Sequence, residues 1–201
     1  MTKKLLLAAG IALALLLVWI IGFWHPAGNQ AHQPIPLAAA PTGGDFTLHS
    51  ADGPVSLKDL RGKVVLVYFG YTFCPDICPT SLAYTSQALD LLSKDELART
   101  QVLFISVDPE RDTLKKLKQY ATFFHPKVLG ITGTPQEVAA VAKLYGASYS
   151  RQNTGSAGGY VVDHSAATYV VDPSGKMVAT LQHGTPPAEI AKAIRAAMQE
   201  K

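Results

Sequence analysis

The chain has 201 residues, which is enough for one domain with a sizeable core and some additional segments. Its formal net charge is only +3 and it carries no basic stripe, which argues against a nucleic-acid partner. Hydrophobic residues make up 48% of the chain and charged residues 16%, a composition too apolar for a purely soluble protein.

The apolar excess lies at the front. Lys3 and Lys4 precede an uncharged run of 20 residues, Leu5–Trp24. About 20 apolar residues in a helix span a bilayer core of roughly 30 Å, so residues 1–24 are predicted to form a transmembrane anchor. No Lys or Arg follows until Lys58, and this charge bias predicts a cytoplasmic N-terminus with the rest of the chain outside.

A cleaved signal peptide is the alternative for this segment. Its apolar core is usually about 7–15 residues long, shorter than this run, and the small residues Ala38–Ala40 lie far from it. Both interpretations export the rest of the chain. The stretch 25–41 holds four prolines and no charge, which predicts an extended linker. His25 and His32 within it are interpreted as solvated linker residues.

A single domain is expected over residues 42–201. Continuous apolar runs rich in β-branched residues predict buried strands, and apolar residues at helical spacing predict helices. The expected strands are 64–69, 101–108, 128–132, 167–172 and 177–182. Four helices are expected, starting near 76–79, at Asp112, at Thr134 and at Thr185. The first should end in the charged residues Lys94–Glu96. The third should start with a capping box at Thr134 and end at Gly146 as its C-cap.

Strands that alternate with helices predict a parallel sheet, and the closing hairpin adds antiparallel strands. The expected fold class is therefore α/β: a mixed central sheet flanked by helices, in an order similar to the thioredoxin fold. The segment Ser150–Gly159 holds three glycines and no large apolar residue, so it is expected to be a loose loop.

The only two cysteines, Cys74 and Cys78, have three residues between them and lie where this fold carries its functional pair. A domain of this size does not need a disulfide to fold, although an inert staple remains an alternative. Pro79 places Cys78 near the start of a helix, whose N-terminus favours a thiolate. A thiolate is both a nucleophile and a metal ligand, so a redox pair and a metal site both remain open.

His164 lies just before the expected strand 167–172, in the loop that should face the cysteine loop. Thioredoxin-like redox enzymes usually carry a proline at this place, and this chain has none between Tyr160 and Asp172. Two sulfurs and one imidazole suit copper, Cu(I) above all, and also zinc. Asp163 is a candidate for orienting the imidazole from behind. The remaining histidines, His49, His125 and His183, are interpreted as structural.

At this point the sequence resembles the Sco/SenC family of membrane-anchored copper proteins. The resemblance is carried by "GYTFCPDICPTSL", "ISVDPERDT", "ITGT", "VVDHSAATYVVDPSG" and the apolar N-terminal run, in this order. It implies that Cys74, Cys78 and His164 bind Cu(I), and also Cu(II). It further implies a single-pass protein of the inner membrane with its domain in the periplasm, and a structural role for Asp108 beneath the metal site.

The resemblance also implies a metallochaperone, rather than an enzyme, that delivers copper to the CuA centre of cytochrome c oxidase subunit II. An upstream periplasmic copper chaperone is a further expected partner. The main alternative is a thiol–disulfide oxidoreductase that uses Cys74 and Cys78 to reduce the cysteines of its target. A thiol peroxidase is disfavoured because Tyr71 stands where that chemistry needs Thr or Ser.

Overall fold

The computed structural model describes residues 13, 15–19, 42–153 and 159–199. Residues 13 and 15–19 are helical and exposed. No helix within these described residues is both long and apolar enough to cross a membrane. Most of the predicted anchor and the whole predicted linker 25–41 lie outside the described residues, so both stay predictions.

A five-stranded mixed sheet in the order β5-β4-β3-β8-β9 organises the domain. Its members are β3 (Val64–Gly70), β4 (Thr100–Ser106), β5 (Val128–Ile131), β8 (Thr168–Val171) and β9 (Met177–Leu181). β3 pairs in parallel with β4 and antiparallel with β8, so it is central, and all seven of its residues are buried. This confirms the mixed central sheet, since an apolar run without alternation fits a strand covered on both faces.

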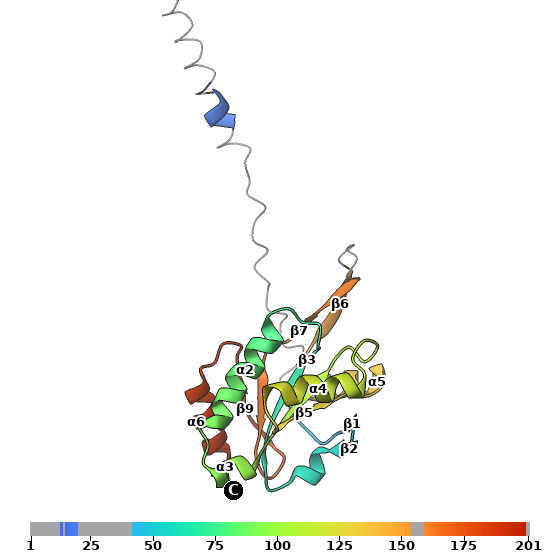
Figure 1. Ribbon diagram of the computed structural model, residues 1–201, viewed down its shortest axis with the longest axis vertical. Coiled ribbons are helices and arrows are strands. Elements are labelled where there is room, and N and C mark those ends of the chain that lie inside the picture. Colours follow the sequence, from blue (N-terminus) through green and yellow to red (C-terminus); the bar gives the residue numbers. More distant parts are fainter. Residues whose placement is uncertain (1–12, 14, 20–41, 154–158, 200–201) are drawn as a thin grey trace, which may run out of the picture. The chain divides into compact units, whose positions relative to one another are not determined.

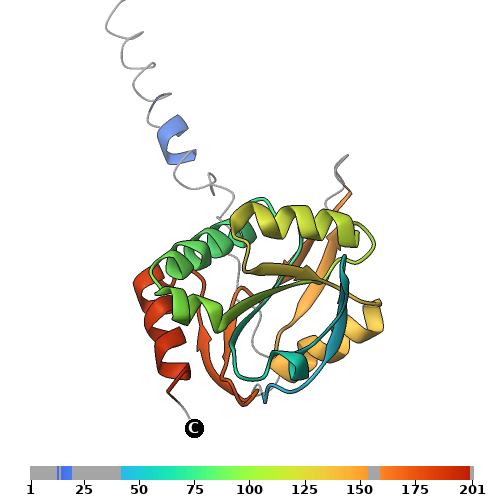
Figure 2. The same cartoon turned by 60° about the horizontal axis from the view of Figure 1, so that its bottom comes forward.

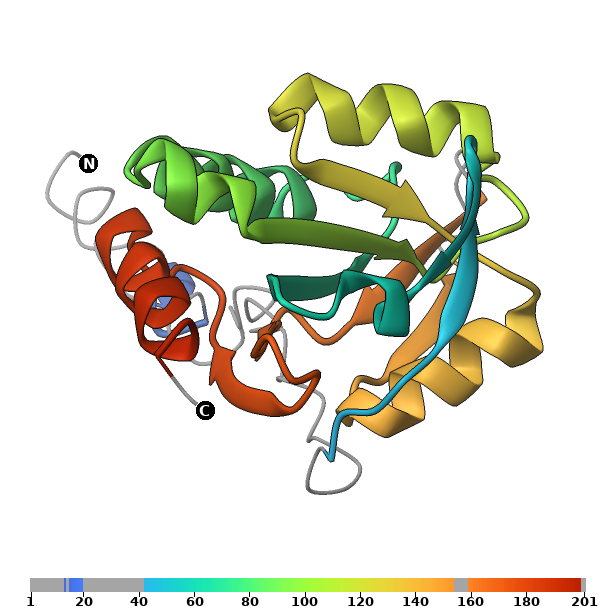
Figure 3. The ribbon, with the colours of Figure 1, turned by 90° about the horizontal axis from the view of Figure 1, so that it is seen from below.

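Helices cover both faces of this sheet (Figures 1 and 3). Three of them, α2 (Ile77–Asp90), α4 (Leu114–Phe124) and α6 (Pro187–Ala197), share one apolar core with Val64, Leu66 and Tyr68 of β3. Helix α5 (Pro135–Tyr145) shares the other core with Val65, Val67 and Phe69. Helices α2 and α6 pack side by side (Figure 2).

Two hairpins outside the main sheet complete the α5 side. Strands β1 (Thr47–Ser50) and β2 (Gly53–Ser56) form the first, and the 3₁₀ turn η1 (Leu57–Leu60) follows it. Strands β6 (Tyr149–Asn153) and β7 (Tyr160–His164) form the second, which extends beyond the body of the domain (Figure 1). The expectation of a loose loop over Ser150–Gly159 was therefore wrong for Ser150–Asn153, which are hydrogen-bonded strand.

Several helix ends agree with the sequence, and two do not. Thr134 and Glu137 form the predicted capping box of α5, and Gly146 ends that helix in the left-handed conformation at φ 65°. Lys94 and its neighbours do not end the cysteine helix; they form a separate helix, α3 (Lys94–Ala98), capped by Ser93. Asp112 does not open α4, because Thr113 provides the side-chain cap.

Candidate metal centre

The cysteine loop, residues 71–76, connects the central strand β3 to helix α2. Cys74 lies in this loop and is half-buried, whereas Cys78 lies in the first turn of α2 and has no exposed surface. Asp76 is the N-cap residue of the helix, as the prolines predicted. Both thiols are free, so the structure brings the two sulfurs together without a disulfide.

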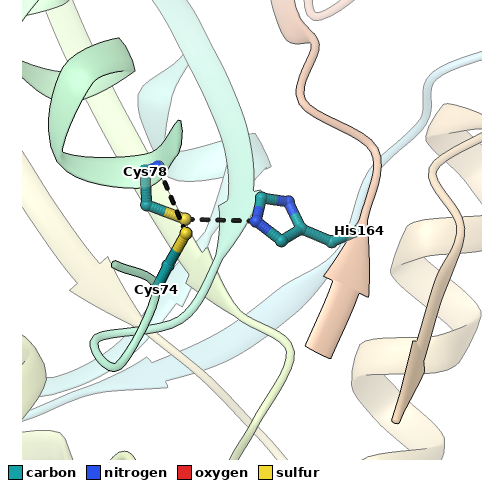
Figure 4. A group of neighbouring side chains, drawn as sticks. All are labelled: Cys74, Cys78 and His164. Carbon is teal, nitrogen blue, oxygen red and sulfur yellow. Dashed lines mark hydrogen bonds between the residues drawn. The ribbon is translucent and has the colours of Figure 1, made fainter. Parts of the chain in front are cut away.

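His164 comes to the cysteines from the opposite side. It is the last residue of β7, paired with Tyr149 across the hairpin. Its Nε2 lies 3.2 Å from the Cys78 Sγ, as Figure 4 shows. The rings of Tyr68 and Tyr71 meet the imidazole edge-on, with centroids 6.2 and 5.8 Å away. These two aromatic contacts limit how far the imidazole can turn.

The hydrogen bond of His164 Nδ1 determines which ring nitrogen carries the proton in the neutral imidazole. Nδ1 lies 3.0 Å from the carbonyl oxygen of Ser165, and a carbonyl can only accept, so Nδ1 carries the proton. In the neutral imidazole Nε2 then presents a lone pair toward the sulfurs. The sequence proposed Asp163 as the orienting residue; in the structure the Nδ1 contact is to the backbone of Ser165, and Asp163 pairs with Ser150 across the hairpin.

The two thiols differ in their acidity. A hydrogen bond from the Cys78 thiol, the neighbouring His164 ring and a hydrogen bond from the backbone N–H of Cys78 lower the pKa of Cys74 to about 4. That N–H, at the start of α2, lies 3.4 Å from the Cys74 Sγ (Figure 4). Burial, reinforced by Cys74, raises the pKa of Cys78 well above its usual value. The expected thiolate at the helix N-terminus is therefore Cys74 alone at neutral pH.

The ligand atoms of Cys74, Cys78 and His164 all lie within 4.8 Å of one another. Among the described residues no other group of three or more Cys, His, Asp or Glu side chains converges in this way. Of the histidines interpreted as structural, His183 contacts Ser81 at 2.9 Å and His125 lies 3.9 Å from Asp90. His25 and His32 lie outside the described residues.

Sequence reasoning identified only part of a further feature of this centre, the segment Asp108–Asp112 after β4. Both aspartates are almost fully buried, and they bond to the cysteine loop and to β7. Asp108 was expected to support the site, whereas Asp112 was expected to start a helix. The available signal was the pair of carboxylates directly after a buried strand, because ionised groups are rarely buried without partners.

Two thiols and one imidazole on a thioredoxin-like scaffold define the class to which this protein belongs: thioredoxin-like proteins with a third, histidine ligand beside the cysteine pair. Within that class the chain belongs to the SCO1/SenC family, whose sequence profile matches residues 36–199. This confirms the resemblance that the motifs indicated.

Individual relatives agree with this assignment. The chain is 42% identical over 151 residues to the mitochondrial SCO2 homolog of Bos taurus, which is 74% of this chain but only 57% of the bovine protein. ScoI of Bradyrhizobium japonicum with copper bound superposes with a TM-score of 0.70 at 39% identity, covering 78% of this chain and 99% of that one. BsSco is described as a member of the Sco family of cytochrome c oxidase assembly proteins with a disulfide switch. It superposes with a TM-score of 0.60 at 25% identity, covering 81% of this chain and 96% of that one.

Proposed function

We propose that this protein is a copper metallochaperone that carries Cu(I), and also Cu(II), on Cys74, Cys78 and His164. The observation that carries the proposal is the convergence of two sulfurs and the lone pair of Nε2 within 4.8 Å. Thiolate and imidazole ligands favour Cu(I), and three of them leave the ion open to exchange. ScoI of Bradyrhizobium japonicum, which carries bound copper, supports copper as the cargo.

The burial of the two cysteines gives the order of copper release. Cys74 is half-buried and reachable from solvent, whereas Cys78 is fully buried. Incoming ligands of a partner therefore replace Cys74 and His164 before Cys78. Cys78 must lose its proton when copper is loaded, so loading releases a proton and is favoured at higher pH.

The proposed recipient is the CuA centre of cytochrome c oxidase subunit II, and the proposed donor is an upstream periplasmic copper chaperone. The description of BsSco as a member of a family of oxidase assembly proteins supports the first of these. The proposed location is the inner membrane, with a single-pass anchor over residues 1–24, a linker over 25–41 and the domain in the periplasm. The apolar run after Lys3 and Lys4 supports it.

A thiol–disulfide oxidoreductase is the second candidate, favoured by the low pKa of Cys74. The Cys74 thiolate would attack a disulfide of the target and form a mixed disulfide. Cys78 would then lose its proton, attack Cys74 and release the target as a dithiol, so the target is reduced and this chain is oxidised. The disulfide switch described for BsSco supports this candidate.

One experiment separates the two functions. The full chain is titrated with Cu(I) under reducing conditions, and its rate of disulfide reduction is measured in parallel. One copper per wild-type chain is expected, with tight binding lost in Cys74→Ser and in Cys78→Ser. His164→Ala should weaken copper binding strongly yet keep the reductase rate. Unchanged copper binding in all three variants would sink the metallochaperone.

A further inference from the structure

The segment Asp108–Asp112, which we call the clamp, lies between the cysteine loop and β7. At one end, Asp112 is only 1% exposed. Its Oδ2 accepts the backbone N–H of Thr72 at 2.9 Å and the hydroxyl of Ser106 at 2.6 Å, and its Oδ1 accepts the hydroxyl of Thr72 at 2.5 Å. Bonds to a buried carboxylate are charge-assisted and strong. Thr72 is two residues before Cys74, so this end holds the cysteine loop.

The other end of the clamp holds the strand that carries His164. Asp108 is 2% exposed, and its Oδ1 accepts the hydroxyl of Tyr160 at 2.7 Å. Its Oδ2 accepts the Nε of Arg111, whose Nη1 donates to the carbonyl of Tyr160 at 2.8 Å. The Arg111 guanidinium carbon lies 3.6 Å from the centroid of the Tyr160 ring. Tyr160 begins β7, which His164 ends.

Arg111 also reaches back to the cysteine loop. Its guanidinium carbon lies 4.9 Å from the Phe73 ring centroid and 5.6 Å from that of Tyr71. The hydroxyl of Tyr71 in turn accepts the backbone N–H of Val162 on β7 at 3.3 Å. One guanidinium therefore contacts both segments that supply metal ligands, through charge, hydrogen bonds and ring faces together.

We infer that the clamp sets the separation between the sulfurs of the cysteine loop and the Nε2 of His164, and that Arg111 is its central positioning residue. The inference rests on the proposed metal site. The cysteine loop and β7 are not adjacent strands of one sheet, since β7 pairs with β6 alone. The main sheet brings the start of β8 beside β3 through the pair Tyr68–Thr168, but β7 itself lies outside that ladder, and the side chains of the clamp add a direct connection between β7 and the cysteine loop.

The test compares two arginines that contact the same ring. Arg111→Lys keeps a cation beside Asp108 but removes the planar group that spans the two segments. The matched control is Arg151→Lys: the Arg151 guanidinium carbon lies 3.9 Å from the Tyr160 centroid, but its ion pair, at 2.8 Å, is with Glu110, an exposed residue of the clamp segment, rather than with the buried Asp108. Both full-length variants are measured beside the wild type.

Three properties are measured: the Cu(I) dissociation constant by chelator competition, the thiolate-to-copper absorption band with Cu(II), and the ¹⁵N shift of the His164 ring in the metal-free chain. Arg111→Lys should weaken Cu(I) binding by about tenfold or more, as loss of supporting contacts around metal ligands does. It should also move the band and the ring shift. Arg151→Lys should leave all three at wild-type values.

Thr72→Val and Tyr160→Phe each remove one hydroxyl from one end of the clamp and keep the rest of the side chain. They should give smaller losses of Cu(I) affinity than Arg111→Lys, and they replace Arg111→Lys in the test if that variant does not fold. A lower melting temperature with unchanged band, ring shift and affinity would mean a merely structural role and would overturn the inference, as would equal effects of the two arginines. If the wild type binds no copper, the proposed function fails, while the ring shift still decides on the clamp.

Discussion

At the scale of single residues, Gly70 is a position beside the metal centre that has no room for a side chain. It is the last residue of β3, and a Cβ built on it would lie 2.7 Å from the Cys78 Sγ and 2.8 Å from the Phe104 ring. Contacts under 3.0 Å force one of the groups to move. Phe104 and Cys78 are both fully buried, so neither can turn out into solvent, and a Cβ here displaces the Cys78 sulfur together with its packed neighbours.

Gly70→Ala is therefore expected to lower the free energy of unfolding by about 1–3 kcal/mol, the usual cost of overpacking, and to shift the thiolate-to-copper band. Chemical denaturation and absorption spectroscopy measure the two effects. Gly130→Ala is the control, because a Cβ there would lie 2.5 Å from the backbone oxygen of Leu117, away from the cysteines. It should lose stability with the band unchanged. An unshifted band in Gly70→Ala would contradict the argument.

The acidity of Cys74 gives a second prediction at this scale. Its pKa of about 4 keeps it a thiolate from mildly acidic to neutral pH, whereas Cys78 stays a buried thiol. In the metal-free protein, iodoacetamide should modify Cys74 first, at a rate that changes little between pH 6 and pH 8. An ordinary thiol gains thiolate about tenfold per pH unit in this range.

Mass spectrometry of peptides quenched at each pH follows both cysteines. His164→Ala removes one of the contacts that lower the pKa of Cys74, so its rate should depend more on pH. A Cys74 rate that climbs tenfold per pH unit in the wild type, or Cys78 modified first, would show that the helix N-terminus does not hold a thiolate.

At the scale of secondary structure, the sequence predicted the elements that depend on local patterns. The β3 run, the Thr134 capping box and the Gly146 C-cap all follow from residues close together in the chain. Asp112 was expected to start a helix because aspartate is a good N-cap. Its actual role is visible only in a tertiary contact, the hydrogen bond from Thr72, which lies 40 residues earlier in the chain.

The hairpin β6–β7 was missed for a different reason. Four of the five β6 residues are exposed and polar, so no alternation of apolar residues marks the strand. Its register comes from pairing with β7. The convergence of Cys74, Cys78 and His164 was nevertheless predictable. The fold brings the residues before β8 close to the cysteine loop, and this does not depend on β6.

The pairing of this hairpin predicts how it exchanges amide hydrogen. In the metal-free protein the amides of Ser165, bonded to the Ser148 carbonyl at 2.9 Å, and of Val162, bonded to the Tyr71 hydroxyl, should exchange slowly. Copper should add little protection at either. Tyr71→Phe removes the acceptor of Val162 only, so exchange should speed up there and not at Ser165. Fast exchange at both amides until Cu(I) is added would mean that metal orders the hairpin.

At the scale of the whole molecule, the described residues from 42 onward form a domain with two apolar cores of its own. The buried apolar residues of both cores fall between Phe46 and Ala197. All 15 acidic residues lie at or after Asp45, so the domain is close to neutral and only Lys3 and Lys4 mark the other side of the apolar run. The proposed anchor is therefore expected to take its orientation from these two lysines.

The full chain is accordingly predicted to stay with the membrane fraction after alkaline carbonate washing, and a chain starting at residue 42 to be released. Protease added to spheroplasts should reach the domain of the wild type. Lys3→Glu combined with Lys4→Glu removes the positive flank and should leave part of the chains inverted and protected from protease. Lys115→Glu, on the exposed surface of α4, is the matched charge change and should leave the orientation unchanged.

Full protection of the wild-type domain from protease would contradict export. Release of the full chain by carbonate would contradict the anchor, because about 20 apolar residues held in a bilayer do not leave it in alkali.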